Sequence, residues 1–124
     1  MNRFLSVAAL ACGLVAALMG AAGRASATGC DAVDCVPNVA RHVVAGTPCV
    51  PQRVFAFGVD AANNTLVCAS WGVWAPAGPL VGLRDVALPC YRQNDSAQES
   101  DGIPLMCANI NNGLRWAHRA DTPG

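Results

Sequence analysis

The stretch Leu66-Val67-Cys68-Ala69, followed by Trp74, is the clearest structural signal in the chain because it occurs twice. The second copy is Leu105-Met106-Cys107-Ala108, followed by Trp116. Self-similarity within one chain indicates that a single supersecondary unit is used more than once. We therefore expect two related units, each with an apolar strand that carries a cysteine and with a tryptophan beyond it.

A Pro-Cys pair precedes each copy. Pro48-Cys49 lies before the first copy, and Pro89-Cys90 follows 41 residues later. An aspartate also precedes the second cysteine of each copy, Asp60 in one and Asp101 in the other. These features define two predicted units, residues 46–74 and 87–116.

The N-terminus has the features of a secretory signal peptide. Arg3 is followed by an apolar run over residues 4–22, and Ala25-Ser26-Ala27 matches the A-x-A pattern of a signal peptidase site. We expect residues 1–27 to be removed, which leaves a single domain of residues 28–124. The alternative is an uncleaved anchor, because the apolar run is long enough to span a bilayer.

The cysteine count supports export. The chain has seven cysteines, and removal of the signal peptide discards Cys12. An even number of cysteines in a short exported chain is typical of a disulfide framework. The expected location is therefore extracytoplasmic, either secreted or in the cell envelope. The cysteines that remain are Cys30, Cys35, Cys49, Cys68, Cys90 and Cys107.

Six cysteines allow fifteen pairings. Bridges within the units, Cys49–Cys68 and Cys90–Cys107, are the simplest solution and leave Cys30–Cys35. A bridge between the units, such as Cys68–Cys107, is the main alternative.

The residue pattern predicts a mainly β, disulfide-stapled domain built from two related hairpin-like units and preceded by a signal-peptide helix. Residues 53–59 and 65–69 are rich in β-branched and aromatic residues, and the Asp-Asn segment 60–64 between them predicts a turn. Residues 80–88 predict a further strand. Residues 91–101 are polar and predict a surface loop, so we expect the second unit to lack its first hairpin arm.

Several functional classes find no support in the sequence. The arginines are scattered singly and the chain has no lysine, so no basic stripe suggests nucleic-acid binding. His42 and His118 belong to no zinc motif, and Asp95, Glu99 and Asp101 lack calcium-loop spacing. We therefore expect no metal and no cofactor.

Two functional hypotheses remain. The first is a non-enzymatic binding protein whose partner lies in the cell envelope or in a host. Trp74 and Trp116, the repeated pair, are expected to pack against disulfides. Trp71 has no counterpart in the second copy and is therefore the better candidate for a binding surface.

The second hypothesis is a small extracytoplasmic hydrolase. Its candidate residues are Asp95, Glu99, Asp101 and His118. Convergence of His118 with these carboxylates around a concave site would favour this hypothesis, because catalysis needs polar groups held rigidly together.

Three segments resemble short exported Cys-rich proteins of mycobacteria and related actinobacteria. They are Gly46-x-Pro48-Cys49, Asn64-Thr65-Leu66-x-Cys68 and Ala97-Gln98-x-x-Asp101-Gly102-x-Pro104-Leu105-x-Cys107. The likeness covers most of residues 46–116. That group is associated with secretion and with no established activity, so the resemblance implies export and carries over no catalytic or binding residue.

Overall fold

A computed structural model describes residues 29–124 of the chain. The expected signal peptide, residues 1–27, and its cleavage site lie outside the described residues. The described part is mainly β, as the sequence predicts, and its only helix is the short 3-10 helix η2 (Val33–Cys35). Within residues 29–124, no helix has the length and apolar character needed to cross a membrane.

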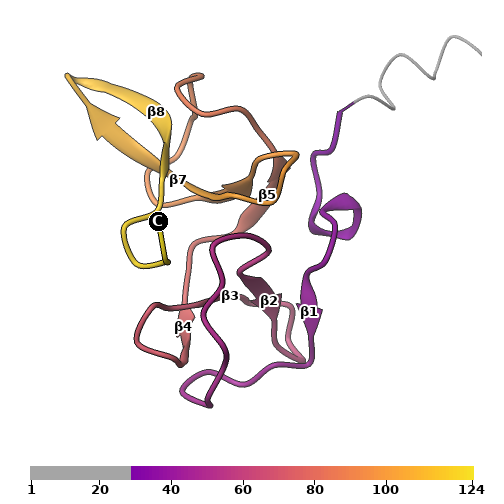
Figure 1. The fold of residues 1–124 in the computed structure, drawn as a ribbon. Helices are drawn as coiled ribbons and strands as arrows, with labels where there is room; N and C mark the ends of the chain where they lie inside the picture. The colour runs from indigo at the N-terminus through magenta and orange to yellow at the C-terminus, as the bar shows by residue number, and fades with distance from the viewer. Residues whose placement is uncertain (1–28) are drawn as a thin grey trace, which may run out of the picture.

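Within residues 29–124, eight strands form two four-stranded sheets, which we call the first lobe and the second lobe (Figure 1). In each lobe the first two strands are parallel and the remaining pairs are antiparallel. The two sheets therefore have the same strand order and directions. The first sheet contains β1 (Ala40–Arg41), β2 (Phe57–Val59), β3 (Thr65–Cys68) and β4 (Trp74–Pro76). The second sheet contains β5 (Leu80–Leu83), β6 (Ser96–Gln98), β7 (Pro104–Ile110) and β8 (Gly113–His118).

The predicted hairpin of the first lobe is present as β2 and β3. Its turn is stabilised by Asp60, whose carboxylate accepts hydrogen bonds from the backbone N–H groups of Asn64 at 2.8 Å and Ala62 at 2.9 Å. Asn63 has a φ of 65°, a conformation that asparagine tolerates better than most residues. The hydrogen bond from the Asn64 backbone is the main cause that lowers the pKa of Asp60.

The prediction of a surface loop over residues 91–101 was wrong for its central part, because Ser96–Gln98 is β6. This strand pairs with β5 and β7 and is fully buried. Two of the polar side-chain atoms buried there have partners: Ser96 Oγ accepts from Arg119 Nη1 at 3.2 Å, and Gln98 Nε2 donates to Pro37 O at 3.3 Å. Gln98 Oε1 has none within the described residues. The first arm of the second lobe is therefore present, with polar residues on either side of the buried Ala97.

The backbone hydrogen bonds show which residues of the two lobes correspond. In the first hairpin the N–H of Asp60 donates to Asn64 O at 3.1 Å, and in the second the N–H of Glu99 donates to Ile103 O at 2.9 Å. Glu99, not Asp101, therefore takes the place of Asp60, which corrects the correspondence expected from the sequence.

The six cysteines pair as Cys30–Cys35, Cys49–Cys68 and Cys90–Cys107, the pairing favoured by the sequence. Cys68 lies opposite Trp74 in the sheet register, and Cys107 lies opposite Trp116.

The strand predicted over residues 80–88 ends at Leu83. The residues that follow it form a segment alongside β8. The N–H of Trp116 donates to Leu88 O at 2.9 Å, and its carbonyl accepts from the N–H of Ala87 at 2.8 Å. In the first lobe, the N–H of Trp74 donates to Thr47 O at 3.0 Å in the same manner. The segment that leads into each Pro-Cys pair thus covers the outer edge of its sheet.

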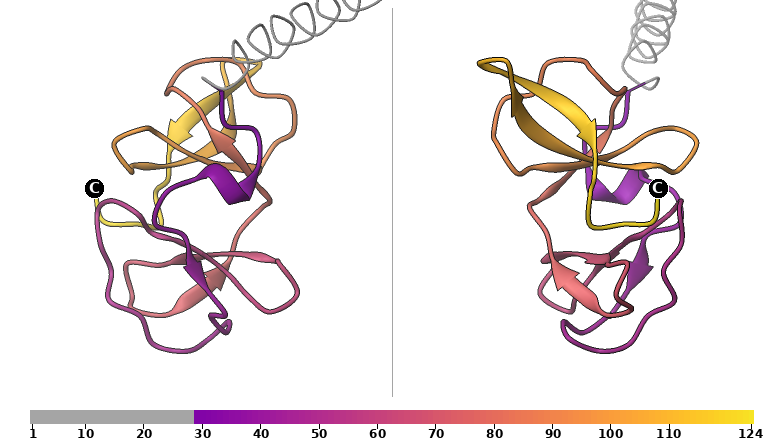
Figure 2. Two further views of the ribbon diagram at one scale, coloured as in Figure 1. Left: turned by 90° about the vertical axis from the view of Figure 1, so that its right-hand side faces the viewer. Right: turned by 60° about the vertical axis from the view of Figure 1, so that its left-hand side comes forward.

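The lobes are joined by core packing and by both terminal segments (Figure 2). Leu80 of β5 is buried in the same core cluster as Phe57 of β2. At the N-terminal end, Cys30 O accepts a hydrogen bond from the N–H of Leu83 at 2.9 Å. At the C-terminal end, Asp121 O accepts from the N–H of Ser70 at 2.9 Å.

Candidate functional site

Trp71 lies on the turn between β3 and β4 and is 64% exposed. The N–H of Cys49 donates to Gly72 O at 2.9 Å, and Pro48 forms an antiparallel bridge with Val73. Val50 lies one residue beyond Cys49 and Trp71 one residue before Gly72, so the two flank this contact. Val50 is 78% exposed, so both segments present a large apolar side chain to water. We call this pair the Trp71–Val50 surface.

A cavity of about 320 Å³ adjoins this surface and shares Val50 with it. Trp74 lines the cavity beside the Cys49–Cys68 disulfide and is only half-buried. Trp116, by contrast, is 3% exposed and belongs to the core cluster of the second lobe. Of the two tryptophans expected to pack against disulfides, Trp116 is therefore buried, whereas Trp74 remains accessible in the cavity. The lining residues are Ala40, Cys49, Val50, Gln52, Phe55, Ala56, Cys68 and Trp74.

The structure brings together two of the four residues proposed for a hydrolase. His118 Nε2 lies 3.1 Å from Glu99 Oε2, because β8 ends at His118 on the same side of the sheet where β6 ends, directly before Glu99. The Asp101 carboxylate instead accepts from the N–H of Ile103 at 3.3 Å and stabilises the turn. Among residues 29–124, no hydrogen bond or ion pair joins Asp95 or Asp101 to His118.

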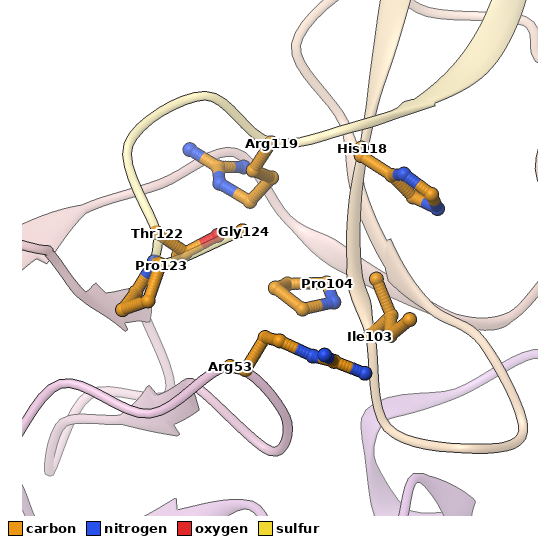
Figure 3. A pocket seen from close by; sticks show the side chains of 8 residues that line it. All are labelled: Arg53, Ile103, Pro104, His118, Arg119, Thr122, Pro123 and Gly124. Atoms are coloured by element: carbon orange, nitrogen blue, oxygen red, sulfur yellow. The ribbon is translucent and has the colours of Figure 1, made fainter.

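His118 also lines a second cavity, of about 160 Å³, at the junction of the two lobes (Figure 3). Arg119 lies next to it and is held in place by Asp121, with Nε–Oδ1 and Nη2–Oδ2 distances of 2.9 Å each. The hydrogen bond from Arg119 lowers the pKa of Asp121, and partial burial opposes this effect. The cavity is lined by Arg53, Ile103, Pro104, His118, Arg119, Thr122, Pro123 and Gly124.

The sequence identified His118 as a candidate and missed Arg53, Arg119 and Thr122. Single arginines at wide spacing carry no motif, and only the packing of the lobes brings these three residues to one cavity. In the part of the chain that the structure describes, no group of three or more His, Cys, Asp or Glu residues is arranged to hold a metal ion.

Comparison of the chain with family models, with curated proteins and with solved structures gives no match. The function is therefore inferred from the two cavities and from the Trp71–Val50 surface.

Proposed function

We propose that this chain is a small, exported, non-enzymatic protein that binds a partner protein of the cell envelope or of a host through the Trp71–Val50 surface. The exposure of Trp71 is the observation that supports this function. Its backbone is held on a tight turn by hydrogen bonds of the neighbouring Gly72 with Ala69 and Cys49, so little backbone entropy is lost when the side chain is covered. Tryptophan is enriched among residues that dominate binding energy at interfaces.

The chemistry of the adjoining cavity favours a protein partner. Its lining includes a single side-chain amide, that of Gln52, among apolar side chains and a disulfide. A sugar ring would need several polar partners, whereas an apolar side chain needs none. We therefore assign this cavity to an apolar side chain of the partner, inserted beside Trp74.

Export and duplication belong to the same proposal. Three disulfides in one small domain are consistent with an extracytoplasmic location, because cytosolic thiols are kept reduced. Residues 1–27 act as the signal peptide. The identical strand order of the two lobes supports an origin by duplication of one unit.

The test is capture of envelope and host-surface proteins by the purified exported protein, with identification by mass spectrometry. A specific partner is retained by the wild type and lost with Trp71→Ala. Tyr91→Ala is the matched control, because Tyr91 is 94% exposed in the second lobe. Equal capture by the wild type and Trp71→Ala would exclude Trp71 as the anchor.

The His118–Glu99 pair favours a second candidate function, a hydrolase. Glu99 would orient the His118 imidazole, which would act as general base on a water molecule. The His118 side chain is 57% exposed, and Thr122 is the only lining residue of its cavity with a hydroxyl or thiol. Hydrolysis of p-nitrophenyl esters that disappears in His118→Ala would establish this activity, and equal background rates would exclude it for these substrates.

A further inference from the structure

The two lobes can be compared position by position around the first-lobe cavity of about 320 Å³. In the first lobe the N–H of Cys68 donates to Ala56 O at 2.8 Å. In the second lobe the N–H of Cys107 donates to Asp95 O at 2.9 Å. Ala56 therefore corresponds to Asp95, in agreement with the registers of the β2–β3 and β6–β7 pairs.

The preceding position has a left-handed backbone in both lobes but a different residue in each. Asn94 in the second lobe has a φ of 75°, and Phe55 in the first lobe has a φ of 56°. Asparagine tolerates this conformation, whereas a bulky residue is rarely found in it. The second lobe thus shows that this backbone can be built without phenylalanine. Strained residues of this kind cluster at functional sites, where the surrounding structure holds them in place.

The second lobe holds Phe55 in its strained conformation. The N–H of Phe55 donates to Gly102 O at 2.8 Å. The Phe55 ring lies so close to Gly102 that a Cβ there would be 2.7 Å from Phe55 Cε1. Phe55 also lines the cavity. One wall of the cavity is therefore an aromatic residue that is fixed from the other lobe.

Trp74 supplies a second aromatic wall, and its ring also lies against a glycine. A Cβ at Gly58 would be 3.0 Å from Trp74 Cζ3. The second lobe has Ala97 at the position that corresponds to Gly58. The Cys49–Cys68 disulfide lines the cavity as well. The residues that distinguish the first lobe from the second therefore build a cavity with two aromatic walls and a disulfide.

We propose that this cavity binds a flat aromatic ring, supplied by an aromatic side chain of the partner protein. The inference rests on the proposed function and specifies the apolar side chain that enters the cavity. An aromatic ring gains stacked or edge-to-face contacts with aromatic walls, and favourable contacts with sulfur, whereas a saturated group gains only burial. An apolar cavity of about 150 Å³ already holds benzene, so the volume here admits one substituted ring.

The experiment is a ¹H–¹⁵N NMR titration of the exported protein with p-cresol, which has the ring of a tyrosine side chain. We expect saturable shifts of the backbone amides of Phe55, Ala56 and Trp74. 4-Methylcyclohexanol has the same substituents on a saturated ring and should bind about fivefold more weakly, because it lacks the aromatic contacts. Absence of saturation with p-cresol, or equal affinity for the two probes, would overturn the proposal.

N-Acetyltyrosinamide separates a side chain of a protein from a free aromatic molecule. It carries peptide groups on both sides of the same ring, as a residue of a partner protein does. We expect it to shift the same amides as p-cresol and to compete with it. Saturable binding of p-cresol without binding of N-acetyltyrosinamide would overturn the assignment to a side chain of a partner.

Phe55→Asn is the decisive variant, because the second lobe uses asparagine at this position. The fold is expected to persist, and dispersion of the NMR spectrum checks this. We expect the preference for p-cresol over 4-methylcyclohexanol to shrink, since one aromatic wall is lost. Phe55→Leu keeps an apolar side chain and should lose the same preference. Tyr91→Asn removes an exposed aromatic ring outside the cavity and should bind both probes as the wild type does.

An unchanged preference in both Phe55 variants would overturn the proposal. Its failure is distinguishable from failure of the proposed function. Capture of a partner that depends on Trp71, without saturable binding of p-cresol, would retain the Trp71–Val50 surface and reject the aromatic site. Saturable binding of p-cresol with equal capture by the wild type and Trp71→Ala would retain the aromatic site and reject Trp71 as the anchor.

Discussion

The guanidinium of Arg119 lies 5.9 Å from the centre of the Phe57 ring. Phe57 begins β2 in the first lobe, and Arg119 follows β8 in the second. The same guanidinium donates to Ser96, which begins β6. Arg119 thus contacts β2 in the first lobe and β6 in the second, which are corresponding strands. These contacts tie the two sheets together.

Arg119→Ala should destabilise the protein by about 2–4 kcal/mol, because it removes the contact with Phe57 and leaves Asp121 and Ser96 without their partner. Urea unfolding measures this change. Arg92→Ala is the control, since Arg92 is exposed, and it should change stability by less than about 0.5 kcal/mol. Equal stability of the two variants would contradict the role given to Arg119.

Acidification should destabilise the protein in part through Asp121. Its pKa is below the ordinary value of 3.8 because Arg119 stabilises the charged carboxylate. The charged form therefore contributes stability above pH of about 4, and this contribution is lost as the pH falls through the folded-state pKa. The wild type should be more stable than Asp121→Asn at pH 7, with the difference shrinking toward pH of about 2. A difference that is constant with pH in urea unfolding would argue against this linkage.

Gly82→Ala should lower the free energy of unfolding by more than about 3 kcal/mol. Gly82 has a φ of 144°, and a Cβ there would collide with the carbonyl oxygen of Cys30, which binds the N–H of Leu83. Gly46→Ala separates the effect of the positive φ from that of the steric collision. Gly46 has a φ of 84°, but a Cβ there meets nothing within 4 Å. We expect about 1–2 kcal/mol for Gly46→Ala from backbone strain alone. Equal thermal shifts for both variants would show that the contact with Cys30 is unimportant.

Removing each of the three disulfides singly should lower the free energy of unfolding by different amounts. Cys49–Cys68 and Cys90–Cys107 join residues 19 and 17 positions apart, whereas Cys30–Cys35 joins residues 5 apart. Chain entropy predicts losses of about 3 kcal/mol for each longer bridge and about 2 kcal/mol for the short one. Paired Cys→Ala variants compared by urea unfolding check this order. A larger loss for the Cys30–Cys35 variant would indicate that this bridge acts mainly by anchoring the N-terminal segment.

Gln98→Met should change stability by less than about 1 kcal/mol. The Gln98 side chain is buried, and its Oε1 atom has no partner within the described residues. Methionine loses the bond to Pro37 but also removes the unsatisfied oxygen. Gln98→Glu should instead cost more than about 3 kcal/mol, because it buries a carboxylate. A strongly destabilised Gln98→Met would reveal a partner for Oε1.

The sequence predicted the parts of the fold that depend on local residue patterns. The Asp60 turn and the strand around Cys68 follow from turn chemistry and β-branched residues, and the duplication of the cysteine pattern favoured the observed pairing. It missed β6 because Ser96 and Gln98 are polar, and their burial depends on partners more than 20 residues away. The cavity at the lobe junction was missed for the same reason, since Arg53 and Thr122 come to line one cavity only after the lobes pack.

The segments that cover the outer edges of β4 and β8 affect how the protein behaves at high concentration. An open sheet edge is a template on which a second copy can add a strand, and this is a common route to fibres. At Trp74 and Trp116 the backbone groups on that side are already bonded within the chain. Each Pro-Cys pair also places a proline, which has no N–H to offer, on the covering segment. The same residues that staple each lobe therefore oppose polymerisation from these two edges.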